Sequence, residues 1–249
     1  MSVDTPLASG RYISSALTSV GNVRQHNEDA FLSQPEQAHW VVADGMGGHS
    51  AGDVASQSIV DALQVFEQQP QLSDSVDLLE NILLETNQKL LDLASGEQKI
   101  IGSTVAGLVL MPDFYLLYWC GDSRIYLYRN GVLVQESVDH TYTQGLIAQG
   151  RLTPEEALVH PQRNVITRAV GAADALYIDM DIRNLHPGDR FLICSDGLDK
   201  ELSDTDIAEF MAQRHLSLKR LAEDMMDCCL ARGGRDNITL ILIENPSVA

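Results

Sequence analysis

Acidic residues stand at the ends of several apolar, strand-like segments of this 249-residue chain: Glu28, Asp29, Asp44, Asp122, Asp196 and Asp236. Charged groups at the edge of an apolar core are costly unless they are paired or bind a metal. Strand ends bring residues that are distant in sequence to one edge of a sheet. Hard divalent cations prefer such oxygen ligands. The pattern therefore predicts a divalent metal site.

Two of these acids are followed directly by glycine, in the pairs Asp44–Gly45 and Asp196–Gly197. Glycine permits unusual backbone angles and lets a carbonyl group or a substrate approach the chain closely. A single Asp-Gly pair is more simply interpreted as an ordinary turn. The recurrence of acids at strand ends shifts the balance towards a metal site with a bare backbone beside it.

The composition is that of an acidic globular protein with a substantial core. Apolar residues make up 45% of the chain, and 35 acidic against 17 basic residues give a net charge of -18. Such a surface repels phosphate backbones and anionic lipids, so neither nucleic acids nor membrane surfaces are expected partners. Most of the charge is interpreted as a solvated surface, and part of it as carboxylates that hold cations.

The cysteines and the N-terminal sequence indicate a cytoplasmic protein. Cys120 and Cys194 lie in apolar strand-like segments and are expected to be buried free thiols, and the adjacent Cys228 and Cys229 are a poor disulfide pair. Free thiols fit a reducing compartment. The N-terminal residues lack the features of a secretory signal, and no apolar segment approaches the ~18 residues of a membrane-spanning helix.

The periodicity of apolar residues predicts the elements that position these acids. Alternating, continuously apolar or β-rich segments predict strands at residues 11–20, 30–32, 40–43, 104–111, 115–120, 125–129, 132–135, 177–182, 190–194 and 237–244. The four strands between 104 and 135 are expected to form an antiparallel meander, with a hairpin turn at Asn130–Gly131. Helical spacing predicts helices at residues 52–69, 73–94, 204–213 and 218–232.

The polar segment at residues 139–171 interrupts the strands, and it contains two predicted short helices at residues 141–149 and 154–159. We interpret this segment as a flap over one end of the sheet. Antiparallel strands with helices gathered in pairs predict an α+β fold, and the length fits one domain spanning residues 1–249.

Seven segments occur in one order along nearly the whole chain: GNVRQHNED (21–29), VVADGMGGHSAGDVAS (41–56), GSTVAGLVL (102–110), GDSRIYLYRNG (121–131), DHTYTQGLIAQGRLTPEEALVHPQRNVITRAVG (139–171), GDRFLICSDGL (188–198) and RDNITLILI (235–243). This ordered set resembles the motifs of the metal-dependent protein serine/threonine phosphatases of the type 2C family, in their compact bacterial form. A lone DGMGG would be a weak signal, whereas the whole set is very specific. The resemblance implies an α-β-β-α sandwich, in which paired helices flank two antiparallel sheets.

The resemblance also implies two Mg²⁺ or Mn²⁺ ions at one end of the sandwich. By carry-over from the motifs, Asp44 bridges both ions and the Gly45 carbonyl helps to hold one of them. Asp196 and Asp236 hold the other ion. Glu28 and Asp29 act mostly through bound water. Asp122, together with Asp196, matches a third metal site.

The implied reaction is hydrolysis of a phosphoserine or phosphothreonine ester in a protein. Two ions ~3.5–4 Å apart share a water and lower its pKa toward neutrality, so that it attacks phosphorus in line without a covalent phosphoenzyme. Arg24 binds the phosphate in this scheme, because its planar guanidinium matches two phosphate oxygens. A surface ion pair with Glu28 is the alternative interpretation of Arg24.

The implied partners are phosphorylated proteins, among them the substrates of a cognate serine/threonine kinase, and a monomer is the expected state. A phosphatase-like module that binds phosphorylated partners without hydrolysing them is a second hypothesis. Such a module should have lost one or more metal carboxylates, which this chain retains. A third hypothesis is a phosphatase of a partner-switching pathway that acts on an anti-sigma-antagonist-like protein.

The chain departs from the family pattern at two places. Met46 stands where many eukaryotic relatives carry a histidine that is a candidate general acid, and methionine cannot donate a proton. Other candidates, each more simply interpreted as structural, are His49, His140 and His160. After Asp196–Gly197, the residues of the family motif are usually neutral, whereas this chain has the charged residues Lys200 and Glu201. The sequence offers no physical reason for them.

Overall fold

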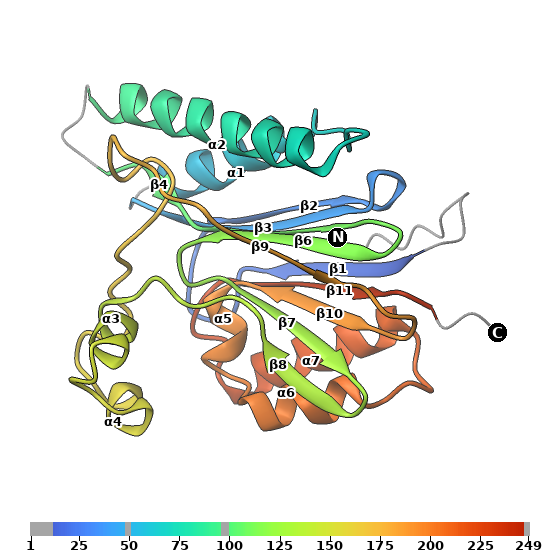
Figure 1. The fold of residues 1–249 in the computed structure, drawn as a ribbon. Coiled ribbons are helices and arrows are strands. Elements are labelled where there is room, and N and C mark those ends of the chain that lie inside the picture. Colours follow the sequence, from blue (N-terminus) through green and yellow to red (C-terminus); the bar gives the residue numbers. More distant parts are fainter. Residues whose placement is uncertain (1–11, 48–50, 96–99, 247–249) are drawn as a thin grey trace.

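Two antiparallel sheets lie face to face, and helices cover the outer face of each (Figure 1). The computed structural model describes residues 12–47, 51–95 and 100–246. The first sheet has the order β1 (Ile13–Ser19), β11 (Ile238–Glu244), β10 (Arg190–Cys194), β7 (Arg124–Arg129) and β8 (Val132–Gln135). The second has the order β2 (Asp29–Gln34), β3 (His39–Met46), β5 (Val105–Leu110), β6 (Phe114–Cys120) and β9 (Asp179–Asn184), with β4 (Gly102–Ser103) paired to β3.

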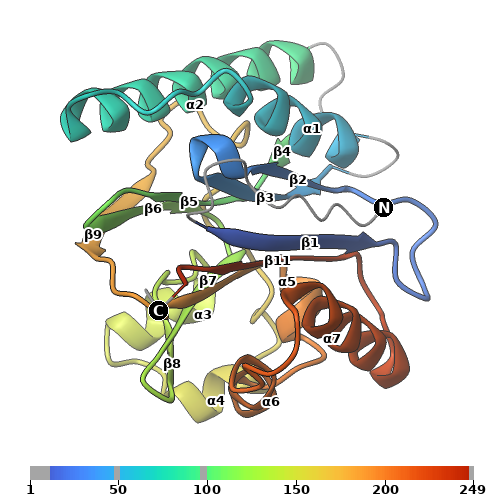
Figure 2. The same ribbon diagram turned by 90° about the vertical axis from the view of Figure 1, so that its right-hand side faces the viewer.

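The helices form one layer on each side of the sheets, as Figures 1 and 2 show. The second sheet is covered by α1 (Ala51–Leu63) and α2 (Leu72–Ala94), and the first by α6 (Asp204–Met211) and α7 (Leu218–Arg232). Short turns lie at η1 (Pro35–Gln37) and α5 (Asp196–Asp199), and α3 (Tyr142–Ala148) and α4 (Pro154–Leu158) stand apart from the layers at one end of the sandwich. The arrangement is the predicted α-β-β-α sandwich. Among the described residues, no helix combines the length and apolar character that crossing a membrane requires.

Three apolar cores separate the four layers, because the central strands are buried on both faces. In β3, Trp40 and Val42 point into the core between the sheets, whereas Val41 and Ala43 point into the core beneath α1 and α2. The same alternation occurs in β11 between the central core and the core beneath α6 and α7. Strands with two buried faces have nearly continuous apolar sequences, which explains why these segments are so easily found in the sequence.

The register of the strands brings several strand ends to one end of the sandwich. β1 and β11 pair over their whole length, with Ile13 opposite Glu244 and Ser19 opposite Ile238. β11 therefore starts where β1 ends. The first residue of β2, Asp29, lies opposite Asp44 of β3 at this same end, which is also the end that α3 and α4 adjoin in Figure 1.

The predicted meander is wrong. β5 and β6 pair in the second sheet, whereas β7 and β8 pair in the first, and the chain crosses between the sheets after Cys120. Gly121 makes this crossing possible, since its φ is +119° and a Cβ there would lie 2.6 Å from the side chain of Thr104. The predicted hairpin at Asn130–Gly131 is confirmed, with positive φ values of 52° and 83° at the two residues.

Other differences concern the ends of elements. The helix predicted at residues 52–69 ends at Leu63, and the strand predicted at residues 177–182 is β9, two residues later in the chain. Among the strands that the structure describes, β9 is an edge strand that pairs with β6 alone, and its burial is partial, so the apolar pattern fixes its position weakly. The cysteines are free, and Cys120 and Cys194 are buried as predicted.

Candidate active site

Carboxylates from both sheets meet at the end of the sandwich near α3. Asp29 and Asp44 come from β2 and β3, Asp196 opens α5 after β10, Asp236 precedes β11, and Asp122 lies in the crossing after β6. Burial, followed by the charges of Asp29, Asp196, Asp122 and Asp236, raises the pKa of Asp44 well above its usual value. The sequence predicts that these aspartates, together with Glu28, gather at one edge of a sheet; the five aspartates come from two sheets and influence one another at the end of the sandwich.

The backbone around Asp44 is fixed by hydrogen bonds to Thr104. The Asp44 amide donates to Thr104 Oγ1 (3.0 Å), and the Asp44 carbonyl accepts from the Thr104 amide (2.9 Å). The amide of Gly45 donates to the Glu28 carbonyl (3.0 Å). A Cβ on Gly45 would lie 1.9 Å from the Gly52 carbonyl oxygen, so this position requires glycine. The bare backbone anticipated after Asp44 therefore has a steric cause.

Asn237 ties the loop before β2 to the start of β11. Its side-chain amide donates to the carbonyls of Val20 (3.0 Å) and His26 (2.9 Å), and its Oδ1 accepts from the amide of Glu28 (2.9 Å). The acid Glu28 is thereby held near Asp236. No sequence pattern identified Asn237 as a residue that supports the site. Its position directly after Asp236 was the available signal of this role.

Ser195 connects the two sheets through an acid of the site. Its hydroxyl donates to Asp29 Oδ2 (2.7 Å) and accepts from the Thr239 amide (3.0 Å). In the part of the chain that the structure describes, the buried atoms Asp29 Oδ1 and Asp122 Oδ1 have no hydrogen-bond partner. Buried carboxylate oxygens without partners are costly, and a divalent cation satisfies them. This oxygen-only set therefore fits Mg²⁺ or Mn²⁺ in chemical type.

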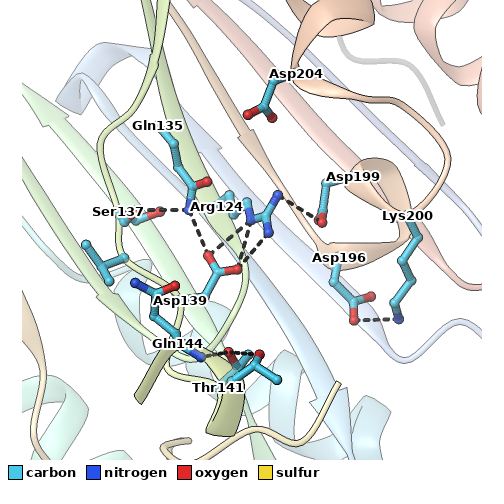
Figure 3. A network of polar contacts seen from close by, with 12 residues as sticks. Arg124, Gln135, Ser137, Asp139, Thr141, Gln144, Asp196, Asp199, Lys200 and Asp204 are labelled. Carbon is cyan, nitrogen blue, oxygen red and sulfur yellow. Dashed lines mark hydrogen bonds and ion pairs between the residues drawn. The ribbon is translucent and has the colours of Figure 1, made fainter. Parts of the chain in front are cut away.

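Cationic side chains engage the more exposed acids of the site. Arg24 contacts Asp236 through Nε–Oδ1 (2.8 Å) and Nη2–Oδ2 (3.0 Å), so its ion pair is with Asp236 rather than with Glu28. Lys200 Nζ lies 2.5 Å from Asp196 Oδ2 and 3.0 Å from Asp236 Oδ2 (Figure 3 shows the first contact). Within residues 12–47, 51–95 and 100–246, no three His, Cys, Asp or Glu side chains form a ready-made group of metal ligands. The acids are neighbours, but part of their charge is already paired with these two cations.

Arg124 organises polar contacts next to these acids, as Figure 3 shows. Its guanidinium donates to Asp139 (Nη2–Oδ2 2.7 Å) and pairs with Asp199 (Nη1–Oδ2 3.0 Å). The contacts connect β7, the segment before α3 and the turn α5. They hold the turn that presents Asp196 and Lys200. The strand-like sequence around Arg124 gave no indication of this role.

Burial and like charges raise the pKa of two acids in this region into the neutral range. Burial, then the charges of Asp196 and Asp139, raises the pKa of Asp122 to about 7. Burial also raises the pKa of Asp199 to about 8, in opposition to the nearby charge of Arg124. A bound divalent cation would favour the ionised forms and reverse this balance for the acids that it contacts.

The metal-free protein is expected to become more stable as the pH falls from 8 to 6.5. In this window the native state takes up protons on Asp122 and Asp199, whereas the unfolded state, with aspartate pKa values near ~4, does not. The free energy of unfolding therefore falls as the pH rises. Below this window the buried His39, whose pKa burial lowers to about 3, opposes the trend. Thermal unfolding in EDTA measures the effect, and an Asp122→Asn variant should show a flatter dependence; a midpoint that increases from pH 6.5 to 8 would contradict the expectation.

The histidines considered as proton donors have structural contacts or lie outside the described residues. His140 Nδ1 accepts from the Gly121 amide (3.0 Å), and its Nε2 lies 3.2 Å from Asp179 Oδ2. It therefore supports the crossing that carries Asp122. His160 Nδ1 accepts a backbone hydrogen bond from its own loop (3.1 Å). His49 lies outside the described residues.

A pocket of about 950 Å³ adjoins the acids. It lies between the segment that carries α3 and α4 and the segment that carries α5 and α6, and its wall includes Lys200 and Asp236. Apolar residues of α3 and α4, such as Ile147 and Leu158, line the opposite side. A ligand in this pocket would lie beside Asp236 and Lys200.

Comparisons with known proteins agree with this fold. Residues 18–233 match the profile of the family described as protein phosphatase 2C. The serine/threonine phosphatase stp of Listeria monocytogenes is 32% identical over 236 residues, which cover 91% of this chain and 93% of that protein.

Two solved structures are similar over almost the whole chain. The structure of PppA, described as a key regulatory component of T6SS in Pseudomonas aeruginosa, has a TM-score of 0.86 at 37% identity and covers 94% of this chain and 97% of its own. The catalytic domain of the serine/threonine phosphatase PstP in complex with two manganese ions has a TM-score of 0.81 at 31% identity and covers 94% and 98%. The chain therefore belongs to the protein phosphatase 2C family.

Proposed function

We propose that the protein hydrolyses phosphoserine and phosphothreonine esters of proteins with two divalent metal ions, and that it opposes a serine/threonine kinase. The observation that carries this proposal is the convergence of five aspartates from both sheets, with buried carboxylate oxygens that have no partner among the described residues. The two manganese ions in the PstP structure support the number and type of ions. Because the same oxygen ligands suit both metals, Mg²⁺ and Mn²⁺ are both proposed cofactors.

The proposed roles of the acids follow their positions. Asp44, whose backbone is fixed by Thr104, would contact both ions, and the Gly45 carbonyl would help to hold one of them. Asp196 and Asp236 hold the other. Glu28 and Asp29 are proposed to act through bound water. Asp122 is proposed to form a third site together with Asp196. When bound, the ions supply the Lewis acidity that lowers the pKa of a water to about 7.

Arg24 is proposed to bind the substrate phosphate. Its side chain is 52% exposed at the rim of the site, and Asp236 holds its guanidinium towards the carboxylates. The planar guanidinium can donate to two phosphate oxygens at once, and this orients the ester for attack from the opposite side. Met46 cannot protonate the departing serine or threonine oxygen, so that proton must come from water or from another group.

The pocket beside Asp236 is proposed to receive the polypeptide on either side of the phosphorylated residue. One of its walls belongs to residues 139–171, which we propose to be a flap of a single catalytic domain spanning residues 1–249. The free cysteines support a cytoplasmic location, and phosphorylated proteins are the proposed partners of a monomeric enzyme.

Hydrolysis of p-nitrophenyl phosphate and of phosphoserine and phosphothreonine peptides tests the proposal. We expect turnover with Mn²⁺ or Mg²⁺, loss of turnover in EDTA, and recovery when Mn²⁺ is added in excess. A phosphotyrosine peptide serves as the specificity control. Tight phosphopeptide binding without metal-dependent turnover would instead favour the binding module, and a strong preference for a phosphorylated anti-sigma-antagonist-like protein would favour the partner-switching pathway.

A further inference from the structure

Lys200 places a positive charge among the acids proposed to bind metal. It follows α5, one helical turn after Asp196, and its ammonium contacts Asp196 Oδ2 (2.5 Å) and Asp236 Oδ2 (3.0 Å). The side chains are 31%, 17% and 22% exposed, respectively, so the contacts are largely shielded from solvent. One ammonium thus bridges two carboxylates that come from different parts of the chain.

The backbone on both sides of Lys200 is held in place. Asp199 pairs with Arg124 (3.0 Å), and Glu201 accepts from the backbone amide of Arg235 (3.3 Å) through its Oε1. Glu201 thereby holds the segment that precedes Asp236. These contacts give a physical reason for the unusual residues 200 and 201, since they direct the lysine side chain to the two carboxylates.

Asp196 and Asp236 are also the pair proposed to hold one of the two ions. An ion ligated by both carboxylates competes with the ammonium for the same oxygen atoms, and the two cations repel each other. Lysine has a flexible four-carbon stem, and the pocket of about 950 Å³ that Lys200 helps to line gives its ammonium space to move away. The lysine can therefore alternate between the carboxylates and the pocket.

We propose that Lys200 is a tethered competitor of the ion at Asp196 and Asp236, so that this ion binds only when the ammonium leaves. The inference rests on the proposed function, because it takes the two acids as ligands of one ion. In the metal-free protein the lysine neutralises part of the acidic cluster and keeps the two carboxylates close together. The affinity for the ion is reduced by the fraction of molecules in which the lysine occupies the site.

Mn²⁺ titration by isothermal calorimetry tests this competition without relying on activity. The variant Lys200→Met keeps the length of the side chain and removes its charge. We expect this variant to bind the more weakly held of its Mn²⁺ ions about tenfold more tightly than the wild type does, because no ammonium has to leave the two carboxylates first. The matched control is Lys219→Met, which removes the same charge from an exposed position at the start of α7 and should leave the affinity unchanged.

Thermal unfolding gives a second measurement. The metal-free Lys200→Met protein should have a lower midpoint than the wild type, and saturating Mn²⁺ should raise its midpoint by more, since tighter binding stabilises the native state further. If the methionine variant does not fold, Lys200→Gln removes the charge while keeping a polar end group, and the same changes are expected.

The possible outcomes separate this inference from the proposed function. Equal or weaker Mn²⁺ binding by the uncharged variants, with normal binding by the wild type, would overturn the competition and leave the metal site intact. If neither the wild type nor the variants bound Mn²⁺, the metal site itself would be refuted, and the competition with it. Tighter binding by Lys200→Met and Lys219→Met alike would reveal a general effect of net charge and would also overturn the proposal.

Discussion

Replacement of Asp44 by asparagine is expected to lower kcat for a phosphoserine peptide by about 10³-fold, since the metal ions of such sites supply several kcal/mol of transition-state stabilisation. Asp44 is the acid on which the charges of all the other aspartates of the site act. It is therefore the best-placed group to contact both proposed ions. An amide at this position retains the shape but not the charge.

The same substitution should leave the fold intact, because the backbone of Asp44, and not its carboxylate, makes the hydrogen bonds to Thr104. Because burial disfavours the charged form of Asp44, a neutral amide should even raise the thermal midpoint of the metal-free protein. Asp61→Asn makes the same chemical change on the exposed face of α1 and serves as the control. Wild-type turnover by Asp44→Asn with Mn²⁺ would show that the assignment of the metal ligands is wrong.

Replacement of Gly197 by alanine is expected to destabilise the protein by about 3 kcal/mol, the upper range for overpacking a core. A Cβ at this position would lie 1.9 Å from the Asn237 carbonyl oxygen. Neither backbone can shift easily, since the side chain of Asn237 makes three hydrogen bonds to the loop before β2. Any movement also separates Asp196 from Asp236, because each adjoins one of the clashing residues.

Urea denaturation and Mn²⁺ titration measure the two parts of this expectation. The midpoint of unfolding of Gly197→Ala should fall, and its affinity for Mn²⁺ should fall with it. Gly145→Ala in α3 is the matched control: a Cβ there meets no atom within 4 Å, so the variant should be as stable as the wild type or up to ~1 kcal/mol more stable. A Gly197→Ala protein with wild-type stability would show that the turn α5 adapts more readily than its packing implies.

Much of the site could be predicted because its acids stand at the ends of strongly apolar strands. In β3 and β10 the apolar sequence ends within two residues of Asp44 or Asp196, so the strand and its terminal acid are recognised together. The ordered motifs then placed Asp236 and Asp122 in the same site. Their position depends on local sequence and on the common fold, both of which a sequence records.

The contacts that the sequence could not reveal join residues that are far apart in the chain. The side chain of Asn237 bonds the Val20 carbonyl, 217 residues away, and no periodic pattern encodes such a pairing. The wrong meander has a related cause, since periodicity identifies β6 and β7 as strands but not the sheet to which each belongs. Lys200 stands one helical turn after Asp196, but its contact with Asp236 depends on the packing of α5 against β11.

The pairing of β1 with β11 has a practical consequence for work with this enzyme. Because Ile13 lies opposite Glu244, the outer ends of both strands lie at the end of the sandwich opposite the carboxylates. A strand of this length spans about 20 Å. A fluorescent reporter attached at Ile13 or Glu244 would therefore lie far from the proposed metal site.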